Sequence, residues 1–220
     1  MTTAIVAPTQ NRIDKSLRII AKCISYIFHP IFIPLFVTYY LLYVQPYFFL
    51  GLSNEDKFRR IAMVSISVTF FPALTVFLLW RLKFIQSIQL RTQKERIIPY
   101  VAANIFFFWA YYVSRNQLDN PVPFTQFLLG VFIASSAALV ANSFTKISMH
   151  VIGVAGAVTF LMYVAMWSGM AMGLPISISI FICGIVCSAR LLLKEHTPAE
   201  VGWGLFVGVF SQLAAAYICR

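Results

Sequence analysis

A short polar stretch between two long apolar runs contains an arginine, a histidine and a carboxylate. Arg190, His196 and Glu200 follow one another at offsets of six and four residues, in a chain that is 60% hydrophobic. A carboxylate beside an imidazole can accept a hydrogen bond from one ring nitrogen and leave the other nitrogen free to attack an electrophile. An arginine nearby supplies a fixed positive charge for an anionic group. The stretch therefore predicts a chemical site, with His196 as the reactive group.

Glu200 also has a purely structural interpretation. Thr197-Pro198-Ala199-Glu200 has the pattern of a helix start, with Thr197 as N-cap, Pro198 in the first position and Glu200 in the third. A threonine and a glutamate at this spacing form a capping box. Both interpretations need the carboxylate at this helix start, and they do not exclude each other.

A second polar stretch precedes the fifth apolar run and contains Ser148 and His150. Ser148 is a plausible N-cap, which would place His150 in the first turn of a helix. Free backbone N–H groups and the positive end of the helix dipole make such a terminus a favourable anion site. A capped helix with an interfacial histidine explains the stretch equally well.

A third group, made of cations, lies just before another apolar run. Arg91, Lys94 and Arg96 fall within six residues. They are suited to binding phosphate, but they are equally typical of the positive residues that anchor a spanning helix at the cytoplasmic surface.

Together the three stretches supply cations, a hydroxyl, two histidines and a carboxylate, a set suited to phosphoryl transfer. The cations and helix N–H groups would bind the equatorial oxygens, one imidazole would attack phosphorus, and the other would protonate the leaving oxygen. Of the acidic residues, only Glu95, Glu195 and Glu200 lie near these stretches, and the first two stand beside lysines, where we expect solvated charge pairs. We therefore expect neither a metal site nor a cofactor.

The composition places this site in a membrane. Only 11% of the residues are charged, whereas soluble domains carry about 25%. The net charge of +10 then favours anionic lipid head groups or a phosphorylated substrate as partners, and not nucleic acid.

Apolar runs long enough to span a bilayer predict an all-α, integral-membrane antiparallel bundle of about seven helices, forming one domain over residues 1–220. The predicted spans are Ile19–Val44, Ile61–Trp80, Ile97–Ser114, Phe124–Phe144, Met149–Gly169, Leu174–Leu193 and Val201–Cys219. His29-Pro30 predicts a kink in the first span, with His29 as a polar group satisfied at the kink.

Seven crossings would bring the three polar stretches and the N-terminus to one side of the membrane. That side carries most of the lysines and arginines, which predicts that it is cytoplasmic. Cations that bind phosphate would inflate this count.

The order and spacing of these residues resemble the type-2 phosphatidic acid phosphatase superfamily, which also includes the vanadium haloperoxidases. Its third motif is Ser-Arg, five residues, His, three residues and Asp; here it is Ala189-Arg190, five residues, His196, three residues and Glu200. Its Pro-Ser-Gly-His motif corresponds to Ile147-Ser148-Met149-His150, and its Lys/Arg motif corresponds loosely to Arg91–Pro99.

The resemblance implies a metal-independent lipid or prenyl phosphatase that works through a phosphohistidine. His196 would be the nucleophile, Glu200 its orienting partner and His150 the general acid. The phosphate would be held by Arg190, Ser148, Lys94, Arg96 and Arg91. Candidate substrates are phosphatidic acid, phosphatidylglycerophosphate and prenyl or undecaprenyl diphosphate.

The family-like core would cover about residues 91–220, with residues 19–80 adding two N-terminal membrane helices. The sequence departs from the family pattern where Glu200 replaces Asp, Met149 replaces Gly and Ala189 replaces Ser. A phosphotransferase that uses the same site, and an inactive transporter or scaffold, remain alternatives. The sequence makes no prediction of the oligomeric state.

Overall fold

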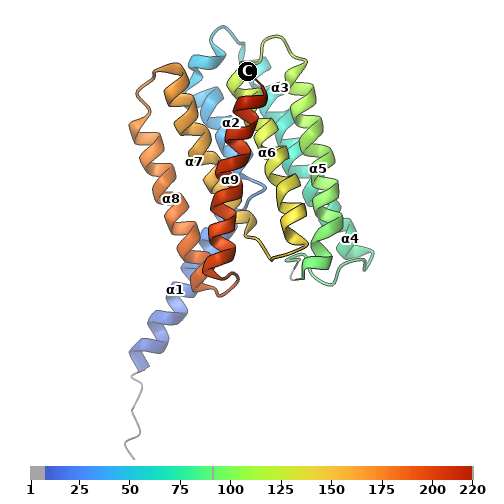
Figure 1. Ribbon diagram of the computed structural model, residues 1–220, viewed down its shortest axis with the longest axis vertical. Coiled ribbons are helices and arrows are strands. Elements are labelled where there is room, and N and C mark those ends of the chain that lie inside the picture. Colours follow the sequence, from blue (N-terminus) through green and yellow to red (C-terminus); the bar gives the residue numbers. More distant parts are fainter. Residues whose placement is uncertain (1–7, 91, 220) are drawn as a thin grey trace, which may run out of the picture.

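The computed structural model describes residues 8–90 and 92–219, and it confirms an all-α membrane bundle. The regular elements of this part are α1 (Pro8–Ile27), α2 (Ile33–Tyr39), a π-helical turn (Tyr40–Val44), a 3-10 turn (Pro46–Phe49), α3 (Asn54–Val64), a second π-helical turn (Ser65–Phe70), α4 (Phe71–Arg81), α5 (Gln93–Arg115), α6 (Val122–Asn142), α7 (Met149–Ser168), α8 (Gly173–Leu192) and α9 (Pro198–Ile218). Figure 1 shows the long helices running roughly side by side.

Six helices in the described residues are long and apolar enough to cross a membrane, so the chain is a multi-pass membrane protein. They are Asn54–Arg81, which joins α3 to α4, and then Gln93–Arg115, Val122–Asn142, Met149–Ser168, Gly173–Leu192 and Pro198–Ile218. Each coincides with a span predicted from the sequence.

The first predicted span, Ile19–Val44, is not one spanning helix. It divides at residues 28–32, and α1 begins at Pro8, in the polar part of the chain. Pro30 lacks a backbone N–H and disfavours helical geometry at His29, so the helix stops. The apolar helix after the break, Ile33–Val44, would extend only about 18 Å, less than the roughly 30 Å of a hydrocarbon core. The kink expected at His29-Pro30 is therefore a complete break.

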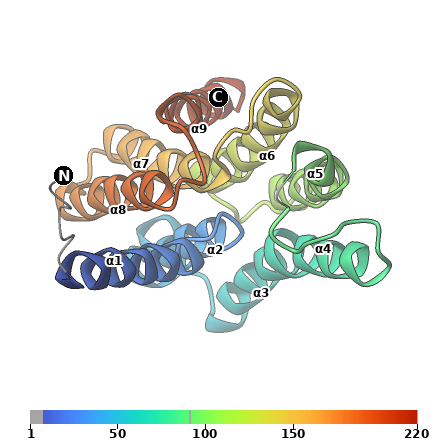
Figure 2. The same ribbon diagram turned by 90° about the horizontal axis from the view of Figure 1, so that it is seen from below.

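Helix α9 packs along α6 and α7, while α1 and α8 lie to one side of the bundle, α3, α4 and α5 to the other, and α2 between them (Figure 2). Phe127 of α6 packs against Phe160 of α7, and Phe124 of α6 packs against Phe49 of the 3-10 turn, with all four rings buried. Close packing here fixes the helices that carry the polar residues.

Two glycines allow α9 to approach α7 closely. A Cβ at Gly208 would lie 2.6 Å from the Ile152 carbonyl oxygen, and one at Gly204 would lie 3.1 Å from the Ser148 carbonyl oxygen. The start of α9 is thus held against the start of α7, which brings His196 and Glu200 toward Ser148 and His150. The connections α4–α5, α6–α7 and α8–α9 all lie at the same end of the bundle (Figure 1).

Candidate active site

His196 lies in the turn between α8 and α9 and is 8% exposed. Its Nδ1 is 3.0 Å from the carbonyl oxygen of Lys146 and 3.2 Å from Oε2 of Glu200. A carbonyl oxygen can only accept a hydrogen bond, so Nδ1 carries the proton and donates it. The lone pair of the neutral ring is then on Nε2, which has no hydrogen-bond partner among the described residues.

Glu200 makes both of the contacts that the sequence suggested. Thr197 and Glu200 form a complete capping box at the start of α9, with Oε2 accepting the Thr197 N–H at 3.0 Å. The same Oε2 contacts Nδ1 of His196. The helix cap therefore holds the carboxylate in the position from which it orients the imidazole.

The surroundings of His196 keep its ring neutral. Burial lowers the pKa of His196 from 6.5 to about 4; the charges of Arg190 and Arg96 also lower it, whereas the Glu200 carboxylate raises it. At neutral pH the imidazole is consequently unprotonated at Nε2, as a nucleophile must be.

Arg190 lies near the end of α8, and only some of its guanidinium nitrogens have a hydrogen-bond or ion-pair partner. Nη1 donates to Ser25 Oγ at 3.3 Å, Nη2 is 3.9 Å from Oε2 of Glu195, and the buried Nε has no partner in the described chain. Glu195, which we expected to be a solvated partner of a lysine, thus pairs weakly with Arg190. A buried donor without an acceptor is costly in a folded protein.

Ser148 is the N-cap residue of α7, as predicted, but its hydroxyl makes no capping bond. The Ser148 Oγ is buried without a partner in the described residues, so it is a second unsatisfied polar atom among the predicted site residues. His150 lies in the first turn of α7, where its Nε2 is 3.1 Å from the carbonyl oxygen of Ser25. The charge of Arg190 acts on His150 as well as on His196.

Only one of the predicted cations of the 91–96 stretch is seen to reach the site in the described residues. Arg96 reaches the site: its Nε donates to the Leu90 carbonyl at 2.9 Å and its Nη1 to the Ile147 carbonyl, next to Ser148, at 3.4 Å. Lys94 is exposed and makes no contact with the other site residues. Arg91 lies outside the described residues.

Glu95 forms a capping box with Thr92 at the start of α5, so this acidic residue supports the helix that carries Arg96.

An open cleft of about 530 Å³ is lined in part by His196. Its lining includes Lys146, Lys194, Glu195, His196, Thr197 and Glu200. Arg190 and His150 are not part of this lining. A larger apolar groove between α5, α6 and the α3–α4 helix has none of the site residues in its lining. The described residues also contain no group of three His, Cys, Asp or Glu side chains that could hold a metal ion.

Sequence reasoning missed two contributors. The Lys146 carbonyl fixes His196, and Ser25 contacts both Arg190 and His150. A backbone carbonyl leaves no trace in residue type, and Ser25 lies outside the motifs.

His29, which we expected to be satisfied at the kink, accepts the Ile31 N–H at a long 3.4 Å and faces the His150 ring.

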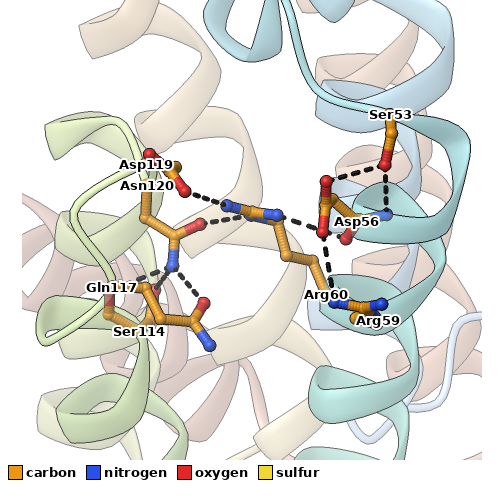
Figure 3. A network of polar contacts seen from close by, with 8 residues as sticks. All are labelled: Ser53, Asp56, Arg59, Arg60, Ser114, Gln117, Asp119 and Asn120. Atoms are coloured by element: carbon orange, nitrogen blue, oxygen red, sulfur yellow. Dashed lines mark hydrogen bonds and ion pairs between the residues drawn. The ribbon is translucent and has the colours of Figure 1, made fainter.

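A second buried arginine lies at the opposite end of the bundle. Arg60 of α3 donates from Nε to Asn120 Oδ1 at 2.6 Å and from Nη1 to the Asp56 carbonyl at 3.2 Å (Figure 3). Its Nη2 is 4.0 Å from Asp119 Oδ2. These contacts tie the start of α3 to the connection between α5 and α6.

No protein-family model, curated protein or solved structure matches this chain.

Proposed function

We propose that this protein is a membrane-embedded phosphatase that hydrolyses a lipid or prenyl phosphate or diphosphate without a metal, through a phosphohistidine at His196. The observation that carries the proposal is the fixed tautomer of His196. One ring nitrogen is held by the Lys146 carbonyl and Glu200, and the other is free. The resemblance to the type-2 phosphatidic acid phosphatases supports the same roles.

In the proposed first step, Nε2 of His196 attacks phosphorus and the bond from phosphorus to the leaving oxygen breaks. His150, which takes up a second proton when the phosphate dianion binds, gives that proton to the leaving oxygen and becomes neutral. In the second step His150 takes a proton from water, the resulting hydroxide attacks phosphorus, and the phosphorus–nitrogen bond breaks. Phosphate leaves and His196 returns to its neutral form.

The unsatisfied donors of the site are suited to the charge that develops on the phosphate oxygens. Arg190 Nε and Ser148 Oγ are buried without partners in the described chain, and Arg96 adds a positive charge nearby. Donors that are already in place stabilise a transition state without reorganisation.

The position of the site favours a lipid substrate. Its residues come from the ends of apolar helices, at one end of the bundle. A phosphorylated head group at that depth would leave its chain in the bilayer. The excess of lysine and arginine in the connections at this end supports a cytoplasmic orientation, shared with the N-terminus.

Phosphate release from a panel of lipid and prenyl phosphates tests the proposal, with purified wild type and His196→Ala compared in detergent. We expect activity that survives EDTA, falls with vanadate and is lost in His196→Ala. Arg59→Ala is the matched control, because Arg59 makes only exposed ion pairs at the other end of the bundle. Full activity in His196→Ala would refute the mechanism.

A further inference from the structure

The break between α1 and α2 frees a backbone carbonyl that reaches the site. In a continuous helix the His29 N–H would bond to the Ser25 carbonyl. That bond is not formed in the described chain, since the last turn of α1 closes with the Phe28 N–H on the Ile24 carbonyl. The Ser25 carbonyl instead accepts a hydrogen bond from Nε2 of His150 at 3.1 Å.

This contact determines which nitrogen of His150 exchanges its proton. Because the Ser25 carbonyl can only accept, Nε2 keeps its hydrogen, and Nδ1 is the nitrogen that gains or loses a proton. The Lys146 carbonyl fixes His196 in the same way, but at Nδ1. Each of the two imidazoles therefore has one nitrogen fixed by a backbone carbonyl.

Ser25 also contacts Arg190 through its side chain. The buried Ser25 hydroxyl accepts from Nη1 of Arg190 at 3.3 Å. A single residue of α1 thus links the arginine of α8 to the histidine of α7.

His29 follows in the same break and packs against the ring of His150. The two ring centroids are 5.2 Å apart and the ring planes are inclined by 82°, an edge-to-face contact. The charge of Arg190 acts on His29, His150 and His196, which are all the histidines of the chain. His29 belongs to the same cluster as the two histidines already placed in the site.

We propose that the α1–α2 break is a positioning element of the site. The Ser25 carbonyl and the His29 ring hold His150 with Nδ1 as its proton-donating nitrogen, and the Ser25 hydroxyl holds Arg190. This role rests on the proposed phosphatase function. It adds to the site a segment that lies outside residues 91–220.

Substrates that differ in their leaving group test the role of His29. An alkyl phosphate needs a proton on its leaving oxygen, whereas p-nitrophenyl phosphate releases a stable phenolate and needs little help from a general acid. His29→Ala should therefore lower kcat for a lipid phosphate about 10-fold, part of the typical contribution of a general acid. Its KM, and its rate with p-nitrophenyl phosphate, should stay within about two-fold of wild type.

His29→Phe keeps a ring against His150 and should restore most of the lost kcat. Ser25→Ala keeps the carbonyl but removes the acceptor of Arg190, so it should raise KM more than it lowers kcat. Tyr26→Ala is the matched control, because Tyr26 is in the same turn and is 68% exposed. Equal losses with both substrates in His29→Ala, or no loss with either, would overturn the proposal.

A measurement that needs no activity separates this proposal from the phosphatase function. In ¹⁵N-histidine NMR, single substitutions assign the three rings, and without substrate His150 of the wild type should be the neutral Nε2–H tautomer. His29→Ala should give a mixture of tautomers. An unchanged tautomer in that variant overturns the positioning role, whereas a wild type that hydrolyses no phosphate ester overturns the phosphatase function alone.

Discussion

Two buried arginines lie at opposite ends of this bundle, and their hydrogen bonding differs. Arg60 is 7% exposed and has all of its buried nitrogens partnered within the described chain. The Arg190 side chain is similarly buried, at 11% exposed, yet its Nε has no partner and its contacts to Ser25 and Glu195 are long.

The difference indicates separate uses of the same residue type. A buried guanidinium whose donors are all occupied stabilises the contact between two segments, whereas one with an unoccupied donor is destabilising until an anion binds. Ser148 Oγ, another of the buried side-chain atoms without a partner in the described residues, lies at the Arg190 end.

Arg190→Met gives the sharpest test of this contrast. We expect phosphatase activity to fall at least about 100-fold, the typical cost of losing one preorganised donor to the transition state. Thermal stability should change little, because the lost hydrogen bonds are few and long. Phosphate release and thermal melting in detergent measure the two effects. A large fall in melting temperature would assign Arg190 a structural role.

Arg60→Met should show the reverse pattern. Asn120 and Asp119 would lose their partner, at a cost of about 1–3 kcal/mol in the free energy of unfolding. The activity of each folded molecule should be unchanged, since the cluster is at the other end of the bundle. Loss of activity without destabilisation in this variant would contradict the structural role assigned to Arg60.

The two functions of Glu200 can be separated by a pair of variants. Glu200→Gln keeps an acceptor for the Thr197 N–H but loses the charge beside His196, so activity should fall about 10-fold with a nearly unchanged melting temperature. Thr197→Ala keeps the carboxylate and loses the cap hydroxyl, at a cost of about 1 kcal/mol in stability. Equal effects of the two variants on activity would show that the cap alone matters.

A further expected effect is a pH dependence of stability. The pKa of His196 is about 4 in the folded protein and 6.5 as its reference value, so the unfolded chain binds an extra proton between these values. Stability from His196 is therefore complete above about pH 6.5 and is lost as the pH falls through 4. Melting temperatures between pH 7 and pH 4 should fall more in the wild type than in His196→Asn. Parallel curves would contradict the low pKa.

The sequence alone predicted the membrane class, the six long spans and the helix start at Thr197. Apolar runs, charge content and a capping pattern are local properties, and the hydrogen-bonding needs of a backbone in lipid turn them into helices. The pairing of His196 with Glu200 was also predictable, because both residues lie in one helix start and its preceding turn.

Only the tertiary structure decided which residues meet. The Lys146 carbonyl that fixes His196, the free donor of Arg190 and the contact of Ser25 with His150 depend on the packing of α1, α7, α8 and α9. The sequence predicted one span through His29, but the first helix breaks there, and its freed carbonyl reaches His150. Carbonyl partners and unsatisfied donors are properties of packed surfaces, so residue type and spacing do not encode them individually.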